Sequence, residues 1–341
     1  MNPIMTSIII SSLALGTVIT MSSTHWLMAW IGLELNTLAI IPIIAKHHHP
    51  RGTEATTKYF LIQAAASATV LFSSMINAWS TGTWDIMQLT NPCACTMLTM
   101  ALSMKLGLAP LHFWLPEVLQ GSSLKTALII TTWQKLAPMT LLYLTHHSLN
   151  TTILLTMGLM STMVGGWGGL NQTQVRKIMA YSSIAHLGWM ATILTLSPNL
   201  MLLNLALYLM MTLSTFMLLI FSSSKTIKDL TTSWTLSPPT TALMLLLLMS
   251  MAGLPPLTGF MPKWLILQDL TSHNLPTTAT IMALSALLSL FFYLRLTYTT
   301  TLTMSPTTTQ NKLKWRLQPK LKTTILSMAT MLSTTLLPIT P

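Results

Sequence analysis

The chain has 341 residues, of which 51% are hydrophobic and 7% are charged, and its mean hydropathy is +0.62. Soluble domains carry about 25% charged residues, so this composition excludes an ordinary soluble domain. The net charge of +11 is spread over loops between apolar stretches, which points to membrane topology rather than to a nucleic-acid partner.

Apolar stretches of about 20 residues, the length that crosses a bilayer, recur along the whole chain. The first has neither a basic segment before it nor a small-residue cleavage site, so it is expected to be a permanent helix. We predict eleven spans, near residues 3–22, 25–45, 57–79, 93–119, 124–145, 149–170, 175–196, 198–221, 240–270, 276–298 and 323–340. The sequence therefore predicts an all-α polytopic membrane protein that forms one transmembrane domain over residues 1–341.

The basic residues alternate between the two sides of this predicted topology. Fourteen of the 17 Lys and Arg residues lie in or beside loops that follow an even-numbered span: Lys46, Arg51, Lys58, Lys125, Arg176, Lys177, Lys225, Lys228, Arg295, Lys312, Lys314, Arg316, Lys320 and Lys322. Basic loops remain on the inner side of a membrane. We therefore predict that the N-terminus lies inside and, after eleven spans, that the C-terminus lies outside.

Two proline-containing stretches suggest an internal repeat. GLAPLHFWLP (107–116) and GLPPLTGFMP (253–262) match without gaps at five of ten positions. Proline interrupts a helix, so spans four and nine are expected to be discontinuous. Because they are five spans apart, they should run in opposite directions, as in an inverted repeat of two five-helix halves (1–146 and 149–298), followed by an additional helix at 323–340. The alternative is that Pro and Gly are simply common in membrane helices.

Four charged residues fall inside predicted spans: Glu34, Lys105, Lys135 and Lys263. An ionised Lys or Asp at the centre of a membrane helix costs about 2.5–3.5 kcal/mol, so these groups are expected to face the bundle interior. Lys263 is the best placed of the lysines to reach the membrane surface. Burial favours the neutral amine and a nearby carboxylate favours the ammonium. We therefore predict a buried proton relay, with purely structural charges as the alternative.

Two histidines are candidate relay groups. His112 lies in the first predicted break and His186 lies in the middle of a span. Histidine exchanges protons around neutral pH, although a lone buried histidine is as often only hydrogen-bonded structure. Ser182 and Ser183 could hold water between the charges.

We expect no metal or redox cofactor to be bound by this chain. Cys93 and Cys95 cannot by themselves complete a zinc site or an iron–sulfur cluster. The run His47–His49 lies beside basic residues and is better explained as a solvated loop than as a metal site. The sequence has no dinucleotide-binding, Walker A or nucleophile-elbow motif, so any redox cofactor should belong to a partner.

Four stretches carry a family resemblance: WIGLELN (30–36), MKLGLAPLHFWLPEV (104–118), QVRKIMAYSSIAHLGW (174–189) and GLPPLTGFMPKW (253–264). They are similar to the antiporter-like membrane subunits of respiratory complex I, the NADH–ubiquinone oxidoreductase, and the resemblance covers essentially the whole chain. The Thr-, Met- and Leu-rich composition resembles an animal chain encoded in mitochondria. The chain has fewer spans than bacterial members, so its docking surface for neighbouring subunits is expected to differ.

The resemblance implies a function in proton translocation. It assigns a carboxylate–lysine pair to Glu34 and Lys105 and a continuing chain of sites to Lys135 and Lys263. It also implies that quinone reduction drives the process, with NADH, FMN, iron–sulfur clusters and ubiquinone held by partner subunits of complex I.

The expected location is the mitochondrial inner membrane, with the N-terminus in the matrix, the C-terminus in the intermembrane space, and lipids such as cardiolipin as neighbours. The motifs are shared with cation/proton antiporters, so an antiporter-type subunit remains an alternative, as does a passive membrane scaffold.

Overall fold

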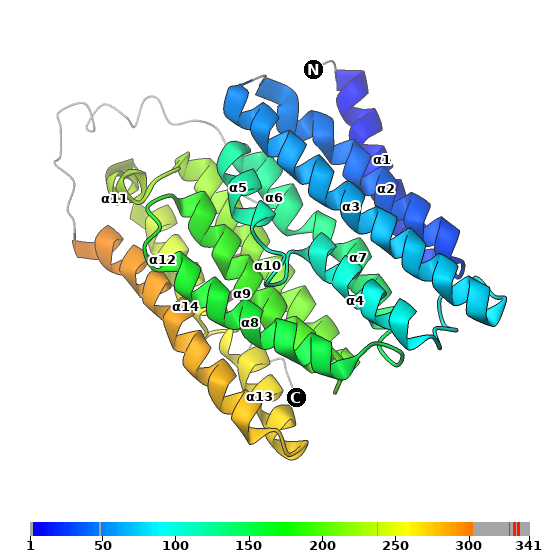
Figure 1. The fold of residues 1–341 in the computed structure, drawn as a ribbon. Helices are drawn as coiled ribbons and strands as arrows, with labels where there is room; N and C mark the ends of the chain where they lie inside the picture. Colours follow the sequence, from blue (N-terminus) through cyan, green and yellow to red (C-terminus); the bar gives the residue numbers. More distant parts are fainter. Residues whose placement is uncertain are drawn as a thin grey trace. The chain divides into compact units, whose positions relative to one another are not determined.

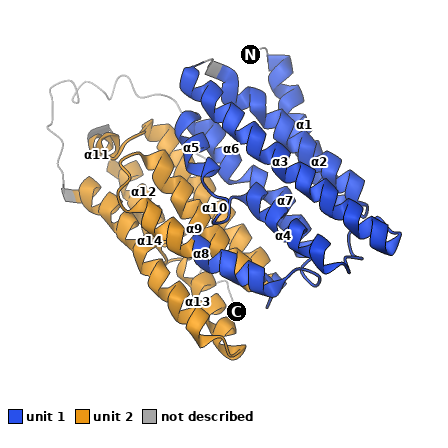
Figure 2. Cartoon of the chain, in the orientation of Figure 1, with its two compact units in different colours: residues 1–161, 194–198 blue, residues 162–193, 199–341 orange. Residues whose placement is uncertain are grey.

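The computed structural model describes residues 3–47, 49–236 and 238–302 and, beyond these, residues 327, 330, 331, 333 and 334. The described part is built from α-helices and contains no β-strand (Figure 1). The chain divides into two compact units (Figure 2), unit 1 with residues 1–161 and 194–198 and unit 2 with residues 162–193 and 199–341. The predicted all-α membrane fold is confirmed.

Unit 1 contains seven complete α-helices among its described residues. They are α1 (Pro3–Ser22), α2 (Trp26–Ile44), α3 (Pro50–Thr81), α4 (Pro92–Leu106), α5 (Trp114–Gly121), α6 (Leu124–Thr131) and α7 (Trp133–Leu144), together with the first part of α8 (Thr151–Gly169). A proline begins α3 and another begins α4, and the side chains of His49 and Asn91 cap these two helices. Proline suits the first turn because the N–H that it lacks would have no partner there.

Glycines bring α1 and α2 into close contact. A Cβ atom on Gly32 would lie 2.6 Å from Thr20 Cγ2 and 2.8 Å from the carbonyl oxygen of Gly16. A Cβ atom on Gly16 would in turn lie 2.9 Å from the carbonyl oxygen of Gly32. Small residues let membrane helices approach to backbone contact, and this contact holds α2, the helix that carries Glu34, against α1.

Unit 2 contains the rest of α8 and six further helices. These are α9 (Val175–Leu194), α10 (Pro198–Ser222), α11 (Ile227–Leu236), α12 (Pro238–Ala252), α13 (Phe260–Ser272) and α14 (Pro276–Leu302). The glycine-rich end of α8 fits closely between its neighbours, since a Cβ atom on Gly165 would lie 2.7 Å from the backbone of Ala185 in α9. One on Gly166 would lie 2.8 Å from Leu288 in α14.

The two predicted breaks are present and have the same local form. Helices α4 and α12 each have 15 residues, and each ends just before a glycine with a φ of +82°, Gly107 or Gly253. After loops of equal length, α5 begins at Trp114 and α13 at Phe260. This agreement supports the repeat, while the inverted arrangement of the two halves stays a prediction.

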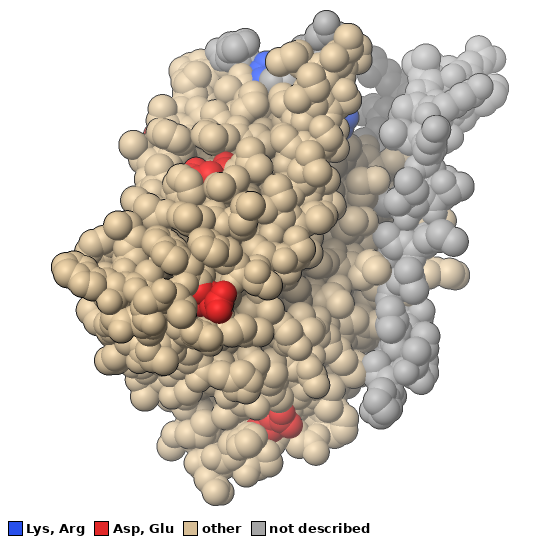
Figure 3. All heavy atoms as spheres, turned by 90° about the vertical axis from the view of Figure 1, so that its right-hand side faces the viewer, with Lys and Arg blue, Asp and Glu red and all other residues tan. Residues whose placement is uncertain are grey.

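Five of the described helices, α1, α2, α3, α10 and α14, are long and apolar enough to cross a membrane. Acidic and basic side chains are sparse on the face shown in Figure 3, as this environment requires. The total number of spans stays a prediction, and the span at 323–340 lies largely outside the described residues.

Three local features differ from the sequence prediction. Helix α3 extends for 32 residues from Pro50, so Arg51 and Glu54 lie on its first turns rather than in a loop. The predicted span 124–145 is divided at Thr132 into α6 and α7. The short helix α11, which has Asp229 in its first turn, was not predicted because its ten residues are too few for a span.

The glycine at the first break is expected to be required for stability. A left-handed backbone costs an L-residue about 1–2 kcal/mol, and a Cβ atom on Gly107 would also lie 3.3 Å from Leu115. Gly82, which has a φ of +73° and nothing within 4 Å, isolates the backbone contribution. We expect Gly107→Ala to lower the midpoint of thermal unfolding in detergent more than Gly82→Ala does. Equal shifts would show that the break tolerates the added atom.

The α1–α2 contact gives a second stability prediction. Gly32→Val forces β-branched atoms into the backbone of α1 and should lower the free energy of unfolding by about 1–3 kcal/mol. Ile31→Val is the matched control because Ile31 is 42% exposed on the same helix. Thermal unfolding of the purified Gly32→Val and Ile31→Val variants measures the stability of each. A Gly32→Val variant as stable as the control would contradict the close contact.

Candidate functional site

Two predicted relay lysines meet in one cavity of unit 1. Lys105 near the end of α4 and Lys135 in the first turn of α7 are only 5% and 2% exposed. Both line a cavity of about 10 Å³, which is enough for about one water molecule. The other lining residues are Tyr59, Gln63, Leu106, Trp114, Leu115, Ile130 and Gln134. The cavity thus combines two amines with several hydrogen-bonding side chains.

The break after α4 shapes one wall of this cavity. Where a helix ends, its last carbonyl groups lose their intrahelical donors. Here the indole N–H of Trp114 donates to the carbonyl oxygen of Met104 at 3.2 Å, and Gln63 Nε2 donates to the carbonyl oxygen of Lys105 at 3.3 Å. Helices α3 and α5 are thereby tied to the end of α4 beside the Lys105 side chain.

The Lys105 amine is left without a hydrogen-bond acceptor among the described residues. Glu34, on α2, is half-buried, and its carboxylate accepts a hydrogen bond from the Thr37 hydroxyl at 3.1 Å. Its charge acts electrostatically on Lys105 and on Tyr59. No ion pair within 4.0 Å joins Glu34 to Lys105 in the described part of the chain. The predicted pair is therefore not in direct contact in this structure, and Glu34 acts on Lys105 at longer range.

Gln134 connects the helices around Lys135. Its Nε2 atom donates to the carbonyl oxygen of Asn36 at 3.3 Å, and its Oε1 atom lies 3.5 Å from the Tyr59 hydroxyl, at the limit of a hydrogen bond. These contacts link α2, α3 and α7. Lys135 itself follows the irregular residue Thr132, whose carbonyl accepts the Lys135 backbone N–H at 3.3 Å.

A second cavity of about 10 Å³ lies within unit 2. It is lined by Ser182, Ala185, His186, Trp189, Lys263, Ser289 and Tyr293. Ala252 is the last residue of α12, and its carbonyl oxygen accepts a hydrogen bond from the Lys263 amine at 2.8 Å. Lys263 therefore turns inward to the break instead of reaching toward the membrane surface. His186 packs against the ring of Tyr208 with 5.4 Å between centroids.

His112 is not among the residues that line either cavity. It is buried in the loop of the first break, with Nδ1 3.3 Å from the carbonyl oxygen of Pro110 and its ring against Phe113. The structure thus brings Lys105 together with Lys135, and His186 together with Lys263. Glu34 acts on Lys105 and is not among the residues that line the Lys105 cavity.

Sequence reasoning missed several polar residues of the cavities. Tyr59 and Gln63 are one helical turn apart on α3, Gln134 precedes Lys135, and Tyr293 lies on α14. Each is a polar residue inside an apolar span, and this was the only feature of the sequence that could have identified it as a cavity residue. Which of them meets a lysine depends on contacts between distant helices, and periodicity does not give these.

The arrangement suits proton exchange better than cofactor chemistry. A buried amine beside room for water can release a proton and take it back when a nearby carboxylate changes its influence. Neither lysine cavity has the volume for a flavin or a quinone. Within the described ranges, no group of three or more His, Cys, Asp or Glu residues could hold a metal ion.

Comparison with known families covers the whole chain. Residues 23–289 match the family described as NADH:quinone oxidoreductase/Mrp antiporter, transmembrane, and residues 290–341 match NADH dehydrogenase subunit 2 C-terminus. NADH-ubiquinone oxidoreductase chain 2 of Xenopus laevis is 61% identical over 100% of this chain and 99% of its own length. That of Latimeria chalumnae is 59% identical over 100% of this chain and 98% of its own length.

Solved structures show the same fold. A chain of respiratory complex I from Thermus thermophilus is similar, with a TM-score of 0.81 and 26% identity over 97% of this chain and 78% of that one. A chain of the Mrp complex from Dietzia shares the fold with a TM-score of 0.77 and 16% identity, over 88% of this chain and 61% of that one. On this sequence identity and coverage, the chain belongs to the NADH–ubiquinone oxidoreductase chain 2 family.

Proposed function

We propose that this chain translocates protons within the membrane arm of complex I through Glu34, Lys105, Lys135 and Lys263, with His186 and His112 as further relay groups. As a member of its family it is a membrane subunit of NADH–ubiquinone oxidoreductase, and the other subunits of that complex are its partners. The observation that carries the proposal is the shared cavity of Lys105 and Lys135, which come from different helices and are both buried.

The geometry around Lys105 supports a switched proton affinity. The Lys105 amine has no hydrogen-bond acceptor among the described residues. The charge of Glu34 nevertheless acts on this amine electrostatically. A closer approach of Glu34 favours the ammonium, and withdrawal favours release of the proton into the cavity. Moving one charge across 100 mV requires about 2.3 kcal/mol, which is within the range that a change in one buried charge pair provides.

The second cavity would continue the relay in unit 2. There the ammonium of Lys263 is held by the carbonyl of Ala252, and His186 shares the cavity lining. Histidine can pass protons at neutral pH through either ring nitrogen. Ser182 and Tyr293 line the same cavity. We infer that they hydrogen-bond to the water that carries the transferred proton.

The driving reaction belongs to other subunits in this proposal. NADH, FMN, iron–sulfur clusters and ubiquinone would be bound by partner chains of the complex. From the basic loops we infer that the N-terminus lies in the matrix and the C-terminus in the intermembrane space of the mitochondrial inner membrane. Those loops would also attract anionic lipids such as cardiolipin.

A cation/proton antiporter activity is the second candidate. The matching family includes Mrp antiporters, and a chain of the Mrp complex has the same fold. Such an activity would exchange cations for protons across vesicles in the absence of NADH, whereas the leading proposal requires electron transfer to drive proton movement.

Substitution of Lys135 tests the proposed function. Lys135→Met removes the titratable amine at similar length, so proton pumping and coupled NADH turnover of the assembled complex should fall by about tenfold or more. Lys125→Met is the matched control because Lys125 is an exposed lysine on the preceding helix, α6. Proton uptake into vesicles measures pumping, and the rate of NADH oxidation measures coupled turnover, in both variants.

Assembly separates this outcome from a scaffold role. If Lys135→Met lowers the amount of assembled complex but leaves pumping per complex unchanged, the charges serve only to hold helices together. Normal pumping in a normally assembled Lys135→Met complex would contradict the proposed function directly.

A further inference from the structure

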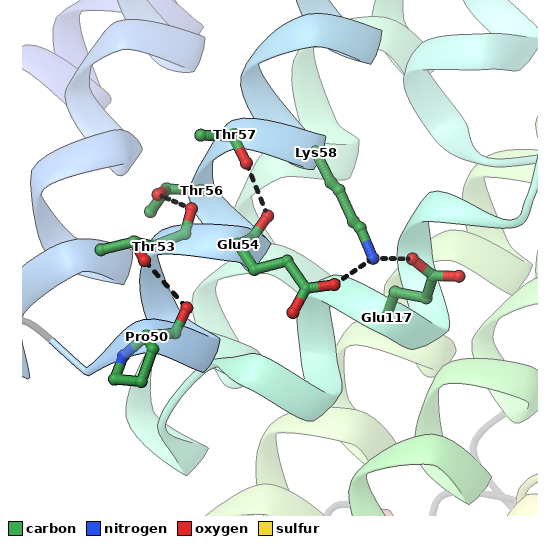
Figure 4. A network of polar contacts seen from close by, with 7 residues as sticks. All are labelled: Pro50, Thr53, Glu54, Thr56, Thr57, Lys58 and Glu117. Atoms are coloured by element: carbon green, nitrogen blue, oxygen red, sulfur yellow. Dashed lines mark hydrogen bonds and ion pairs between the residues drawn. The ribbon is translucent and has the colours of Figure 1, made fainter.

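A cluster of three charged residues joins α3 to α5 at the surface of unit 1 (Figure 4). The Lys58 amine lies 2.5 Å from Glu54 Oε1 on the same helix and 2.7 Å from Glu117 Oε2 on α5. The side chains of Lys58 and Glu117 are 40% and 51% exposed.

Helix α5 depends on α3 for its position. It has eight residues, no side-chain cap at Phe113 and a loop before it, and a helix that short is not stable by itself. Its last residue, Gly121, lies so close to α3 that a Cβ atom would be 2.6 Å from both Ala55 and the carbonyl oxygen of Arg51. Glu117, one turn earlier, supplies the ionic contact. A steric contact and an ion pair therefore fix the same short helix.

Both helices also line the Lys105 cavity. Tyr59 follows Lys58 directly on α3, and Trp114 precedes Glu117 by one turn on α5. The rings of Tyr59 and Trp114 meet edge to face with 5.8 Å between centroids, and both residues line the cavity. Trp114 is in addition hydrogen-bonded to Met104, next to Lys105. A displacement of α5 would therefore move the cavity wall and the backbone beside Lys105.

We propose that Lys58 is a positioning residue for proton transfer: its bridge to Glu117 holds α5 against α3 and thereby keeps the Lys105 cavity in its working shape. This inference rests on the proposed function of that cavity. The contact to Glu54 lies within a single helix and cannot hold α5, so the two carboxylates have different roles. An ordinary surface ion pair contributes little to stability, but this one links two helices that both line the cavity, and it adds to the packing of the buried residues of α5.

The assembled complex in vesicles provides the test, with protons pumped per NADH oxidised as the readout. Lys58→Met and Glu117→Gln should each lower this ratio by about two- to fivefold, the change expected on loss of one partly exposed ion pair. Lys58→Arg should restore it because the guanidinium also binds carboxylates. Glu54→Gln is the matched control and should leave the ratio unchanged.

A variant without a charge change separates position from charge. Gly121→Ala pushes α5 away from Ala55 and Arg51 and should reproduce the loss seen in Lys58→Met. An unchanged ratio in assembled Glu117→Gln or Gly121→Ala complexes would overturn the inference, as would an equal loss in Glu54→Gln. If Lys135→Met abolishes pumping while Lys58→Met does not alter it, only this inference fails. If Lys135→Met pumps normally, the proposed function itself fails.

Discussion

The structure depends on how a largely apolar bundle accommodates buried amines. Each ionised group at the centre of a membrane helix costs about 2.5–3.5 kcal/mol, so it must find charge, hydrogen bonds or water inside the protein. Lys105 and Lys135 share one cavity, and Lys263 binds a backbone carbonyl. For Lys105, whose amine has no hydrogen-bond acceptor among the described residues, this compensation is incomplete, as the proposed proton carrier requires.

The broken helices provide the polar groups for this compensation, and the two units use them differently. In unit 1, Trp114 and Gln63 occupy the carbonyls left at the end of α4, which leaves the Lys105 amine directed to its cavity. In unit 2, the Lys263 amine itself occupies the carbonyl of Ala252. Proton release from Lys263 would therefore weaken that hydrogen bond by removing the positive charge of its donor, whereas at Lys105 the charge of Glu34 favours the ammonium.

Much of this organisation could be predicted from local sequence. The prolines of the two matching stretches predicted both breaks, and isolated charges within apolar runs identified Glu34, Lys105, Lys135 and Lys263 as candidates. The interruption at Thr132 could not be predicted because threonine has no strong effect on helices. The cavity partners Tyr59 and Gln134 were also missed, since their role arises from packing between helices that are distant in the sequence. The contact of Lys58 with Glu117 was not predicted either, because it depends on how α5 packs against α3.

The most direct test of the central claim is to locate ordered water between Lys105 and Lys135 in a high-resolution map of the assembled complex. The account predicts a water molecule in the cavity within hydrogen-bonding distance of an amine, with a polar path toward Glu34 when that carboxylate moves closer. A dry cavity closed by apolar side chains, or lysine side chains directed into lipid, would contradict it.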